Sequence, residues 1–380
     1  MSVTLPLTLA AVVAGIAGTG AAAGVVRRRA RVDGWAVLAG LLAAAAVGAA
    51  ALVWTGTLPS GQIRWGFTAM HLLYLGLTVS LPLLGLGLVV LRLRAGGGRL
   101  VLVGAGLLLL PAPVGAYATH VEPTWLRVDE VAVPVDGGRA GDDPVRVAVL
   151  ADYQTLQVGD HERAAVDAVL ASEPDLVLVA GDLFQGPPER LAAELPALRA
   201  DLGRLRAPHG VYVVRGDSDL GDSADRIFRG SGAVILDDEV VEVAVGDRTV
   251  RIGGTTLAGG LPGDEGGDCV RAELAATPDD EAVTVLLSHR PDTVLGLAPG
   301  AVDLVVAGHT HGGQVVVPGF GPPLTLTDVP RHVARGGLHE VDGNAVYVSP
   351  GVGVERGRAP QVRLFNRPAV GVLTLADRPS

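Results

Sequence analysis

The first third of the chain contains four long apolar stretches, which restrict strongly what this region can fold into. They cover about residues 3–26, 35–54, 67–91 and 100–119, and they contain almost no charged side chains. Each stretch approaches or exceeds the roughly 20 residues that a helix needs to cross a bilayer. A buried helix bundle is the alternative, but the near absence of charge disfavours it. We therefore predict an all-α, four-helix transmembrane region over residues 1–119.

Tryptophans and arginines predict how these helices are placed. The tryptophans lie at or near the ends of the stretches, where the membrane interface favours them: Trp35, Trp54, Trp65 and Trp125. The loops after the first and third stretches contain most of the basic residues of this region, namely Arg27, Arg28, Arg29, Arg31, Arg92, Arg94 and Arg99. Because positively charged loops tend to stay in the cytoplasm, we predict a multi-pass protein of the cell membrane. The residues that follow the fourth stretch would then lie outside the cytoplasm.

Charge is divided unevenly along the chain. Residues 1–126 contain eight arginines and two acidic residues, a net charge of +6, whereas the whole chain carries −10. The remainder therefore carries −16. We do not expect nucleic acid to be a partner of such an acidic domain, since basic patches are what gather phosphate backbones. Cys269 is the single cysteine, so no internal disulfide can form.

Beyond the apolar stretches, a pattern recurs in which a strand-like apolar run ends abruptly at a turn that contains Asp or His. These runs are residues 145–151, 176–180, 211–214, 283–287 and 304–307. Such apolar runs are typical of strands that are covered on both faces, and functional residues collect at the ends of such strands. Helical stretches at 162–171 and 189–205 separate successive runs. The pattern predicts an α/β domain, preceded by a linker over residues 120–144 that includes one strand.

The last of these runs leads into Gly308-His309-Thr310-His311-Gly312-Gly313-Gln314. Glycines allow the tight turn that would let both imidazoles point to one spot, as metal ligands do. A solvated surface pair of histidines is the alternative. The earlier turns, however, supply further ligand types, namely Asp152, Asp182, Asp217 and His289. Together these residues are enough to bind two metal ions.

These motifs, in this order over roughly residues 124–380, resemble the calcineurin-like metallophosphoesterases, and in particular the membrane-associated branch of that family. The resemblance implies a four-layer αββα sandwich over residues 145–380. It also implies hydrolysis of a phosphate ester, phosphodiester or pyrophosphate through attack by a metal-bridging hydroxide. Asp152 and His311 would bind one ion, and Asp182 would bridge the two ions. Asp217, His289 and His309 would bind the second ion, and Asp182, Asp217 and His289 are the residues that we assign to catalysis.

The chain departs from the family pattern at three positions. Gln154 replaces a ligand histidine, and Asp217 replaces an asparagine, so the site gains oxygen ligands and negative charge. We therefore predict that manganese is favoured, with iron or zinc as alternatives. Ser218 replaces a histidine near the leaving group, and a serine hydroxyl is too weak an acid to do the same work. His161 and Arg215 are candidate substitutes, although His161 is better explained as a residue at the start of a helix.

Some questions stay open at the level of sequence. The substrate is expected to be a phosphorylated small molecule or a lipid-linked phosphate. Because of Gln154 and Ser218, a catalytically weak or inactive member that binds a ligand or metal as a sensor is the alternative function. A transport role for the apolar stretches is disfavoured, since they lack the ionisable residues that transport paths need. Asp217, Ser218 and Asp219 also have a purely structural interpretation, as caps of a short helix at 224–228.

Overall fold

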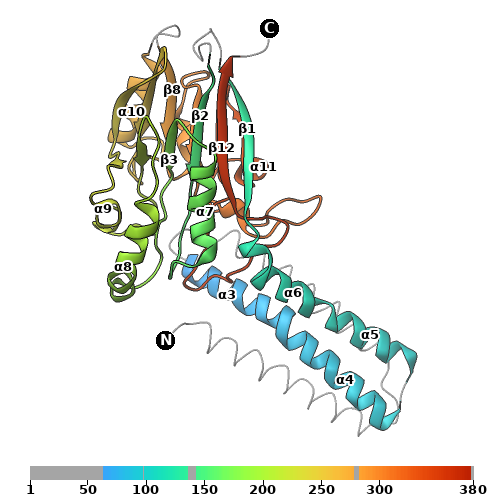
Figure 1. Cartoon of the computed structure of the whole chain (residues 1–380). Coiled ribbons are helices and arrows are strands. Elements are labelled where there is room, and N and C mark those ends of the chain that lie inside the picture. Colours follow the sequence, from blue (N-terminus) through green and yellow to red (C-terminus); the bar gives the residue numbers. More distant parts are fainter. Residues whose placement is uncertain (1–62, 97, 136–142, 278–281, 378–380) are drawn as a thin grey trace. The chain divides into compact units, whose positions relative to one another are not determined.

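The computed structural model describes residues 63–96, 98–135, 143–277 and 282–377 (Figure 1). These residues belong to two compact units. The helical unit comprises the described residues up to Val121 together with Glu355–Val362. The sandwich unit comprises Glu122–Val354 and the residues from Arg363 onward.

The helical unit contains two long apolar segments. Gly66–Arg94 has 29 residues and Arg99–Thr124 has 26, and both are long and apolar enough to cross a membrane. They are built from α3 (Ile63–Leu75), the π-helical turn η2 (Gly76–Ser80), α4 (Leu81–Ala95), α5 (Arg99–Leu109), α6 (Pro111–His120) and the short η3 (Glu122–Thr124). These segments coincide with the third and fourth predicted stretches. The first two predicted stretches lie outside the described residues, so the four-helix arrangement stays a prediction.

Within the helical unit, α4 and α5 pack through a small apolar cluster of Leu88, Val101, Ala105 and Leu108. Gly85 allows this close approach, because a Cβ atom there would lie 2.9 Å from the Cβ of Leu108. Small residues of this kind are typical of helix contacts in membranes.

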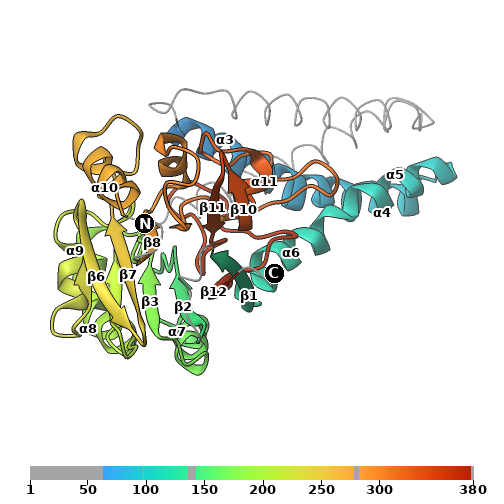
Figure 2. The same cartoon turned by 90° about the horizontal axis from the view of Figure 1, so that it is seen from above.

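The sandwich unit is built on two six-stranded sheets (Figure 2). The order of the first sheet is β1-β12-β2-β3-β4-β5, with β1 at Arg127–Val135, β12 at Ala369–Asp377, β2 at Val145–Leu150, β3 at Leu176–Val179, β4 at Val211–Val213 and β5 at Val234–Ile235. The order of the second is β10-β11-β9-β8-β7-β6, with β10 at Gly337–Val341, β11 at Asn344–Val348, β9 at Leu304–Ala307, β8 at Ala282–Leu287, β7 at Arg248–Gly254 and β6 at Glu239–Val245. Strands β2 to β5 are parallel, as are β7, β8, β9 and β11.

Helices cover the outer face of each sheet. On the first sheet these are α7 (Asp160–Ala171), α8 (Pro188–Leu202) and α9 (Ser223–Phe228). On the second they are α10 (Glu265–Ala275), the 3-10 helix η4 (Pro291–Gly296) and α11 (Arg331–Ala334). The described residues of this unit thus form helix, sheet, sheet and helix layers, and the mixed α/β class predicted from the sequence is confirmed.

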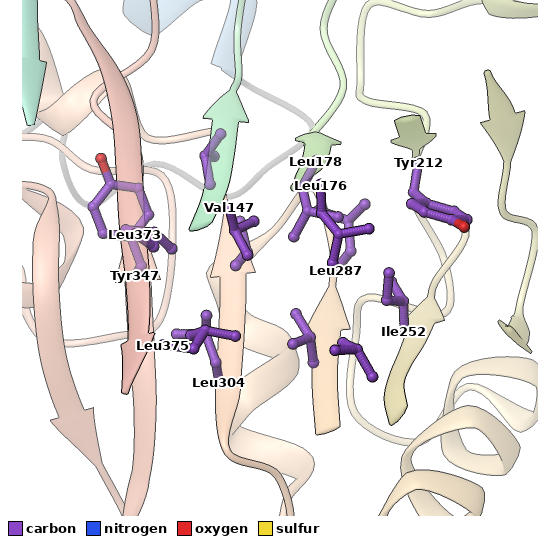
Figure 3. Packing of buried hydrophobic residues seen from close by; sticks show 14 of the residues in the cluster. Val147, Leu176, Leu178, Tyr212, Ile252, Leu287, Leu304, Tyr347, Leu373 and Leu375 are labelled. Carbon is purple, nitrogen blue, oxygen red and sulfur yellow. The ribbon is translucent and has the colours of Figure 1, made fainter. Parts of the chain in front are cut away.

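The main core lies between the two sheets (Figure 3). Alternate residues of each strand point into it, for example Val147 in β2 and Leu304 in β9, whereas their neighbours Ala148 and Val305 pack under the outer helices. Because both faces of these strands are buried, their sequences are apolar throughout. This explains why five apolar runs were recognisable as strands. The strand expected in the linker is β1, which pairs in parallel with β12 at the edge of the first sheet.

Candidate metal centre

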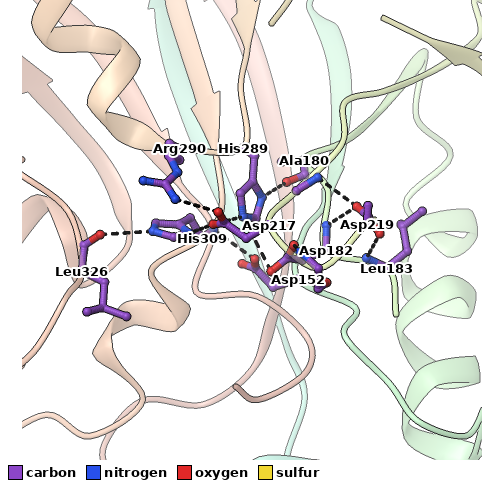
Figure 4. Close-up of polar contacts among 12 residues, drawn as sticks. Asp152, Ala180, Asp182, Leu183, Asp217, Asp219, His289, Arg290, His309 and Leu326 are labelled. Atoms are coloured by element: carbon purple, nitrogen blue, oxygen red, sulfur yellow. Dashed lines mark hydrogen bonds and ion pairs between the residues drawn. The ribbon is translucent and has the colours of Figure 1, made fainter. Parts of the chain in front are cut away.

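The candidate site lies where the central strands of both sheets end (Figure 4). Asp152, Asp182 and Asp217 follow β2, β3 and β4, and His289 and His309 follow β8 and β9. Parallel neighbouring strands bring their carboxyl ends to one edge of a sheet, which is where such sheets place functional side chains. The five turns therefore converge although 157 residues separate Asp152 from His309 in the sequence.

The backbone of these turns takes conformations that residues other than glycine rarely adopt. The φ angles of Asp152, Asp182, His309 and His311 are 46°, 57°, 71° and 47°. Residues with a Cβ are uncommon in this left-handed region, and such strain concentrates at functional sites. Close packing adds a further demand, since a Cβ atom at Gly216 would overlap Oδ1 of Asp182. The turns are thus shaped around the carboxylates.

Asp152, Asp182 and His289 form the first group of ligand atoms, all within 4.8 Å of one another. Asp152 is fully buried, and its Oδ1 accepts a hydrogen bond of 3.0 Å from the backbone N–H of His309. The Oδ2 atom of Asp152 is buried without a hydrogen-bond partner. Asp182 accepts a 2.7 Å bond at Oδ1 from the N–H of Ser218, and its Oδ2 lies 3.6 Å from Nε2 of His289.

Asp217, His289 and His309 form the second group. Oδ2 of Asp217 lies 2.7 Å from Nδ1 of His309 and 3.4 Å from Nε2 of His289. The two imidazole rings meet edge to face, with their centroids 5.1 Å apart. His289 belongs to both groups, so the two ligand sets are adjacent.

Backbone carbonyls orient both of these imidazoles. Nδ1 of His289 lies 2.7 Å from the carbonyl oxygen of Ala180, and Nε2 of His309 lies 3.1 Å from that of Leu326. A ring nitrogen that donates to a carbonyl leaves the other nitrogen directed at the site, which is the usual arrangement of metal-binding histidines. Nε2 of His289 is buried and forms no hydrogen bond.

His311 and Gln154 are placed differently from the other predicted ligands. His311 lies outside both groups of ligand atoms found among the described residues. It is nevertheless buried, and neither of its ring nitrogens has a hydrogen-bond partner. Its carbonyl oxygen accepts a 2.7 Å bond from Nδ2 of Asn366. Gln154 is fully buried beside the first group, and its N–H donates to the carbonyl of Asp182 at 2.8 Å.

The pKa values of the site follow from burial and from the crowding of charges. Burial raises the pKa of Asp152 to about 7. Burial opposes protonation of His289, but the charges of Asp182 and the other carboxylates outweigh it and raise its pKa to about 10. Burial also acts to raise the pKa of Asp217, yet the neighbouring imidazoles of His289 and His309 hold it well below its usual range. Burial keeps the pKa of His311 well below the ordinary value, with Arg363 adding to the effect.

Asp219 has a role in the site that the sequence did not reveal. Its Oδ2 accepts bonds of 2.8 Å from the N–H of Asp182 and 2.9 Å from that of Gly216, while Oδ1 accepts a 2.9 Å bond from Leu183. The buried side chain therefore ties the turn after β3 to the turn after β4. Helix α9 begins at Ser223, with Asp222 before it, so Asp219 is not its cap. The available signal was that Asp219 is an acidic residue in the same turn as Asp217, after the apolar run at 211–214.

Arg215 and His161, the candidate substitutes for the histidine that Ser218 replaces, are directed to other partners. Arg215 forms ion pairs with Asp225 and Asp237, and Nε2 of His161, at the start of α7, lies 3.0 Å from the carbonyl of Val352. Both residues thus have structural partners. The arginine that contacts a carboxylate of the site is Arg290, whose Nη2 lies 2.6 Å from Oδ1 of Asp217.

The donor set fits a pair of divalent cations. Carboxylates and imidazoles converge, and Oδ2 of Asp152, Nε2 of His289 and both ring nitrogens of His311 are buried without hydrogen bonds. Buried polar atoms are normally paired, so the unpaired Oδ2 of Asp152 and Nε2 of His289, which belong to one ligand group, indicate a missing partner. Hard oxygen ligands together with imidazoles suit manganese, iron or zinc.

Comparisons with known proteins agree with this geometry. Residues 145–313 match the family model described as calcineurin-like phosphoesterase. An uncharacterized metallophosphoesterase of Bacillus subtilis, YkuE, is 26% identical over 272 residues, which cover 68% of this chain and 88% of the relative. The phosphodiesterase YaeI of Escherichia coli is 26% identical over 271 residues, or 68% of this chain and 92% of the relative. An uncharacterized metallophosphoesterase of Aquifex aeolicus is 27% identical over 271 residues, which span 70% and 97% of the two chains.

Proposed function

The chain belongs to the calcineurin-like phosphoesterase family, and on this basis we propose that it is a membrane-anchored, dinuclear metal-dependent phosphoesterase. The observation that supports this most strongly is the convergence of Asp152, Asp182, Asp217, His289 and His309 from five separate strand ends. Structural turns alone would not require carboxylates and imidazoles to meet within 4.8 Å.

Each ligand has a distinct part in this proposal. Asp152, with His311 and Gln154 nearby, would hold one cation, and Asp217, His289 and His309 the other. Asp182 lies within the first group, and its Oδ2 faces His289, which belongs to both groups, so it is the residue suited to bridge the cations. Two divalent cations, when bound, supply Lewis-acid activation of the attacking water and of a phosphoryl oxygen.

The chain's own groups would hold these ligands in place during the reaction. The N–H of Ser218 fixes Oδ1 of Asp182, and the carbonyls of Ala180 and Leu326 fix the two imidazoles. Preorganisation of this kind means that no ligand has to reorient as charge develops on the phosphoryl group. The hydroxyl of Ser218 is buried without a hydrogen bond and offers no acid of suitable pKa. The reaction is therefore expected to favour good leaving groups.

For the metal, we propose manganese, with iron or zinc as alternatives. Three carboxylates and two imidazoles form the ligand groups, with the buried amide of Gln154 beside them, and this share of oxygen ligands suits a hard cation. Metal analysis of protein purified without added metal tests the point, and stoichiometric zinc would contradict it.

For the substrate, we propose a phosphate ester, with a phosphodiester as the first candidate because YaeI is named a phosphodiesterase. A lipid-linked phosphate is favoured over a free small molecule by three features. Two described segments are apolar and long enough to span a bilayer, and Trp125 follows directly on the second of them. In the sandwich unit, Phe320 and Phe365 are more than half exposed. Tryptophan is typical of membrane interfaces, and exposed phenylalanines supply apolar area that can insert there.

The same features support a location in the cell membrane, and the arginine pattern of the loops favours an extracytoplasmic sandwich unit. Thiol labelling of intact cells that express the chain with a cysteine at the exposed position of Leu220 would test the orientation. Labelling by a membrane-impermeant reagent is expected, and protection until the cells are lysed would contradict it. Cys269 is exposed and should first be changed to Ser.

The function itself is tested on the full chain in detergent with added Mn²⁺. Aryl phosphates, aryl phosphodiesters and lipid diphosphates form the substrate panel, and His311→Ala is the control. We expect hydrolysis of at least one phosphodiester that is lost in the variant. Bound metal without turnover on any substrate would instead favour the alternative function, a ligand or metal sensor.

A further inference from the structure

Asp217 uses its two carboxylate oxygens for different purposes. Oδ2 faces the imidazoles of His309 and His289, whereas Oδ1 lies 2.6 Å from Nη2 of Arg290 (Figure 4). The site carboxylates Asp152 and Asp182 differ from it in this respect, because their hydrogen bonds come from the neutral backbone N–H groups of His309 and Ser218. Of these three carboxylates, Asp217 is thus the one that forms an ion pair with an arginine.

This ion pair lies where solvent screening is reduced. The side chains of Arg290 and Asp217 are 27% and 32% exposed. A guanidinium is always protonated, so Arg290 keeps its positive charge over the whole working pH range. Since Oδ1 is occupied, only Oδ2 is directed at the imidazoles of the second group.

We propose that Arg290 is a positioning residue that makes Asp217 act on a divalent cation as a neutral ligand with a single donor oxygen. In effect, the Asp217–Arg290 pair carries the same net charge as the asparagine amide that the sequence pattern leads one to expect at this position. The additional carboxylate would then not make the site more negative, which corrects the reason given above for a hard metal. The inference rests on the proposed metal-binding function.

A consequence of this charge balance is that the two residues should compensate for each other. Arg290→Gln leaves the Asp217 charge unbalanced, so cations should bind more tightly and anions less tightly. Asp217→Asn leaves the Arg290 charge unbalanced, with the opposite effects. The double variant, which removes both charges, should return to the behaviour of the native chain.

The experiment measures two affinities of the full chain in detergent for each of these forms. Calorimetry gives the Kd for Mn²⁺, and inhibition of turnover gives the constant for inorganic phosphate. For Arg290→Gln we expect about tenfold tighter Mn²⁺ and about tenfold weaker phosphate, the size of effect that one unit charge at such distances produces when partly screened. Asp217→Asn should weaken Mn²⁺ binding by at least about tenfold, and the double variant should lie within about threefold of the native chain.

Two further variants serve as controls. Arg215→Gln removes an arginine of similar exposure whose partners, Asp225 and Asp237, are not among the metal-site carboxylates, and it should change neither affinity. Arg290→Lys keeps the charge and should stay within about threefold of the native Mn²⁺ affinity, because the charge is the larger part of the effect. It also keeps the test decisive if Arg290→Gln does not fold.

The outcomes separate this inference from the function on which it rests. If Arg290→Gln weakens Mn²⁺ and phosphate together, Arg290 is only a structural support and the inference is wrong. It is also wrong if the double variant binds Mn²⁺ as weakly as Asp217→Asn alone, because removal of the Arg290 charge would then not have compensated for the lost carboxylate charge. If the native chain binds no Mn²⁺ at all, the proposed function itself fails.

Discussion

The helical unit and the sandwich unit place the same kinds of side chain in opposite surroundings. In the helical unit, Leu93 and Leu110 are 77% and 60% exposed, whereas Leu287 and Leu304 in the sandwich unit are fully buried. The sandwich has three apolar clusters of its own, and the described helices share one small cluster. Among the described residues, the sandwich unit thus has an extensive apolar interior and the helical unit only a small one.

This difference indicates which solvent each unit requires. Apolar surface left in water costs about 25 cal/mol per Å², so rows of exposed leucines are stable only against another apolar phase. Segments of 29 and 26 residues are long enough to find that phase in a bilayer, as the proposed membrane location requires. The sandwich needs no such support, and it contains all the metal-site residues. Chemistry and anchoring should therefore be separable.

The largest effect that would sharpen this comparison is expected from Asp182→Ala. The bridging carboxylate would be lost, and with it the stabilisation of several kcal/mol that a correctly spaced metal pair provides. We expect kcat to fall by at least about a thousandfold on a soluble aryl phosphodiester. Steady-state assays at saturating Mn²⁺, together with metal analysis of the purified variant, measure both consequences.

Asp225→Asn is the matched control for this variant, because Asp225 is a carboxylate of the sandwich whose partner is Arg215 and not a residue of either ligand group. It should keep nearly normal turnover. Turnover by Asp182→Ala close to that of the native chain would rule out a mechanism with two bridged cations.

The second effect compares truncation of a leucine in each unit. Leu287→Ala removes a fully buried side chain between the sheets and should lower the free energy of unfolding by about 2 to 5 kcal/mol. Leu107→Ala, at a half-exposed position of α5, should change it by less than about 1 kcal/mol, since lipid or detergent contacts replace its methyl groups. Thermal unfolding in detergent, followed by near-ultraviolet circular dichroism, measures both. Equal losses would show that the helical unit has a packed interior after all.

The two units also differ in how far sequence could predict them. Apolar length alone identified the segments Gly66–Arg94 and Arg99–Thr124, because the length and composition of an apolar helix are local properties of the sequence. In the sandwich, the buried strands and the turn residues Asp152, Asp182, Asp217, His289 and His309 were predicted, since each turn follows directly on an apolar run.

Contacts between distant loops could not be predicted in the same way. Arg215 stands two residues before Asp217 in the sequence, yet Arg290, 73 residues from Asp217, is the arginine that binds this carboxylate. Arg363 is fully buried and donates to the carbonyls of Pro350, Gly351 and Gly353, although nothing in its local sequence indicates burial. Such partners depend on how loops fold back over one another, which no local periodicity encodes.

The third effect concerns pH. Burial raises the pKa of Asp152 to about 7, and a carboxylate must lose its proton before it can bind a cation. Below that pH a proton competes with Mn²⁺, so the apparent affinity should fall by about tenfold per pH unit. Calorimetric titrations with Mn²⁺ between pH 5 and pH 8 test this. Asp152→Asn should remove the additional steepness below about pH 7 and leave the slope due to His289, whose pKa is about 10. A native affinity that does not become steeper below pH 7 would contradict the assignment.

Stability should depend on pH with the opposite sign when no metal is bound. A folded pKa of Asp152 raised above its ordinary value means that this side chain contributes stability below that ordinary value and loses it as the pH rises through about 7. The raised pKa of His289, about 10, acts in the same direction at higher pH. The melting temperature of the metal-free protein should therefore fall as the pH rises, whereas saturating Mn²⁺ should reverse the trend. The helical unit, whose described segments contain neither of these groups, should show no such reversal.

The smallest effect is expected from removal of the helices, and it tests the comparison most directly. A chain of residues 121–380 keeps both sheets and all the metal-site residues. It also keeps Glu122, a buried side chain whose Oε1 accepts a 2.5 Å bond from the N–H of Asn366, the residue that holds the carbonyl of His311. Turnover of a soluble aryl phosphodiester should stay within about threefold of the full chain, because no group of the reaction has been removed.

Glu122→Ala in the same shortened chain is the matched variant. It distinguishes the contribution of the removed helices from that of the residues that follow them directly. Loss of the Glu122 carboxylate leaves the buried N–H of Asn366 without its partner, and Asn366 holds the carbonyl of His311. His311 should then be held less firmly, and Mn²⁺ binding should weaken by about tenfold, as it does when a metal ligand loses an outer hydrogen bond. If residues 121–380 without this substitution already aggregate or lose turnover, the helices contribute to the sandwich itself, and the division of the chain into an anchor and an independent catalytic unit is wrong.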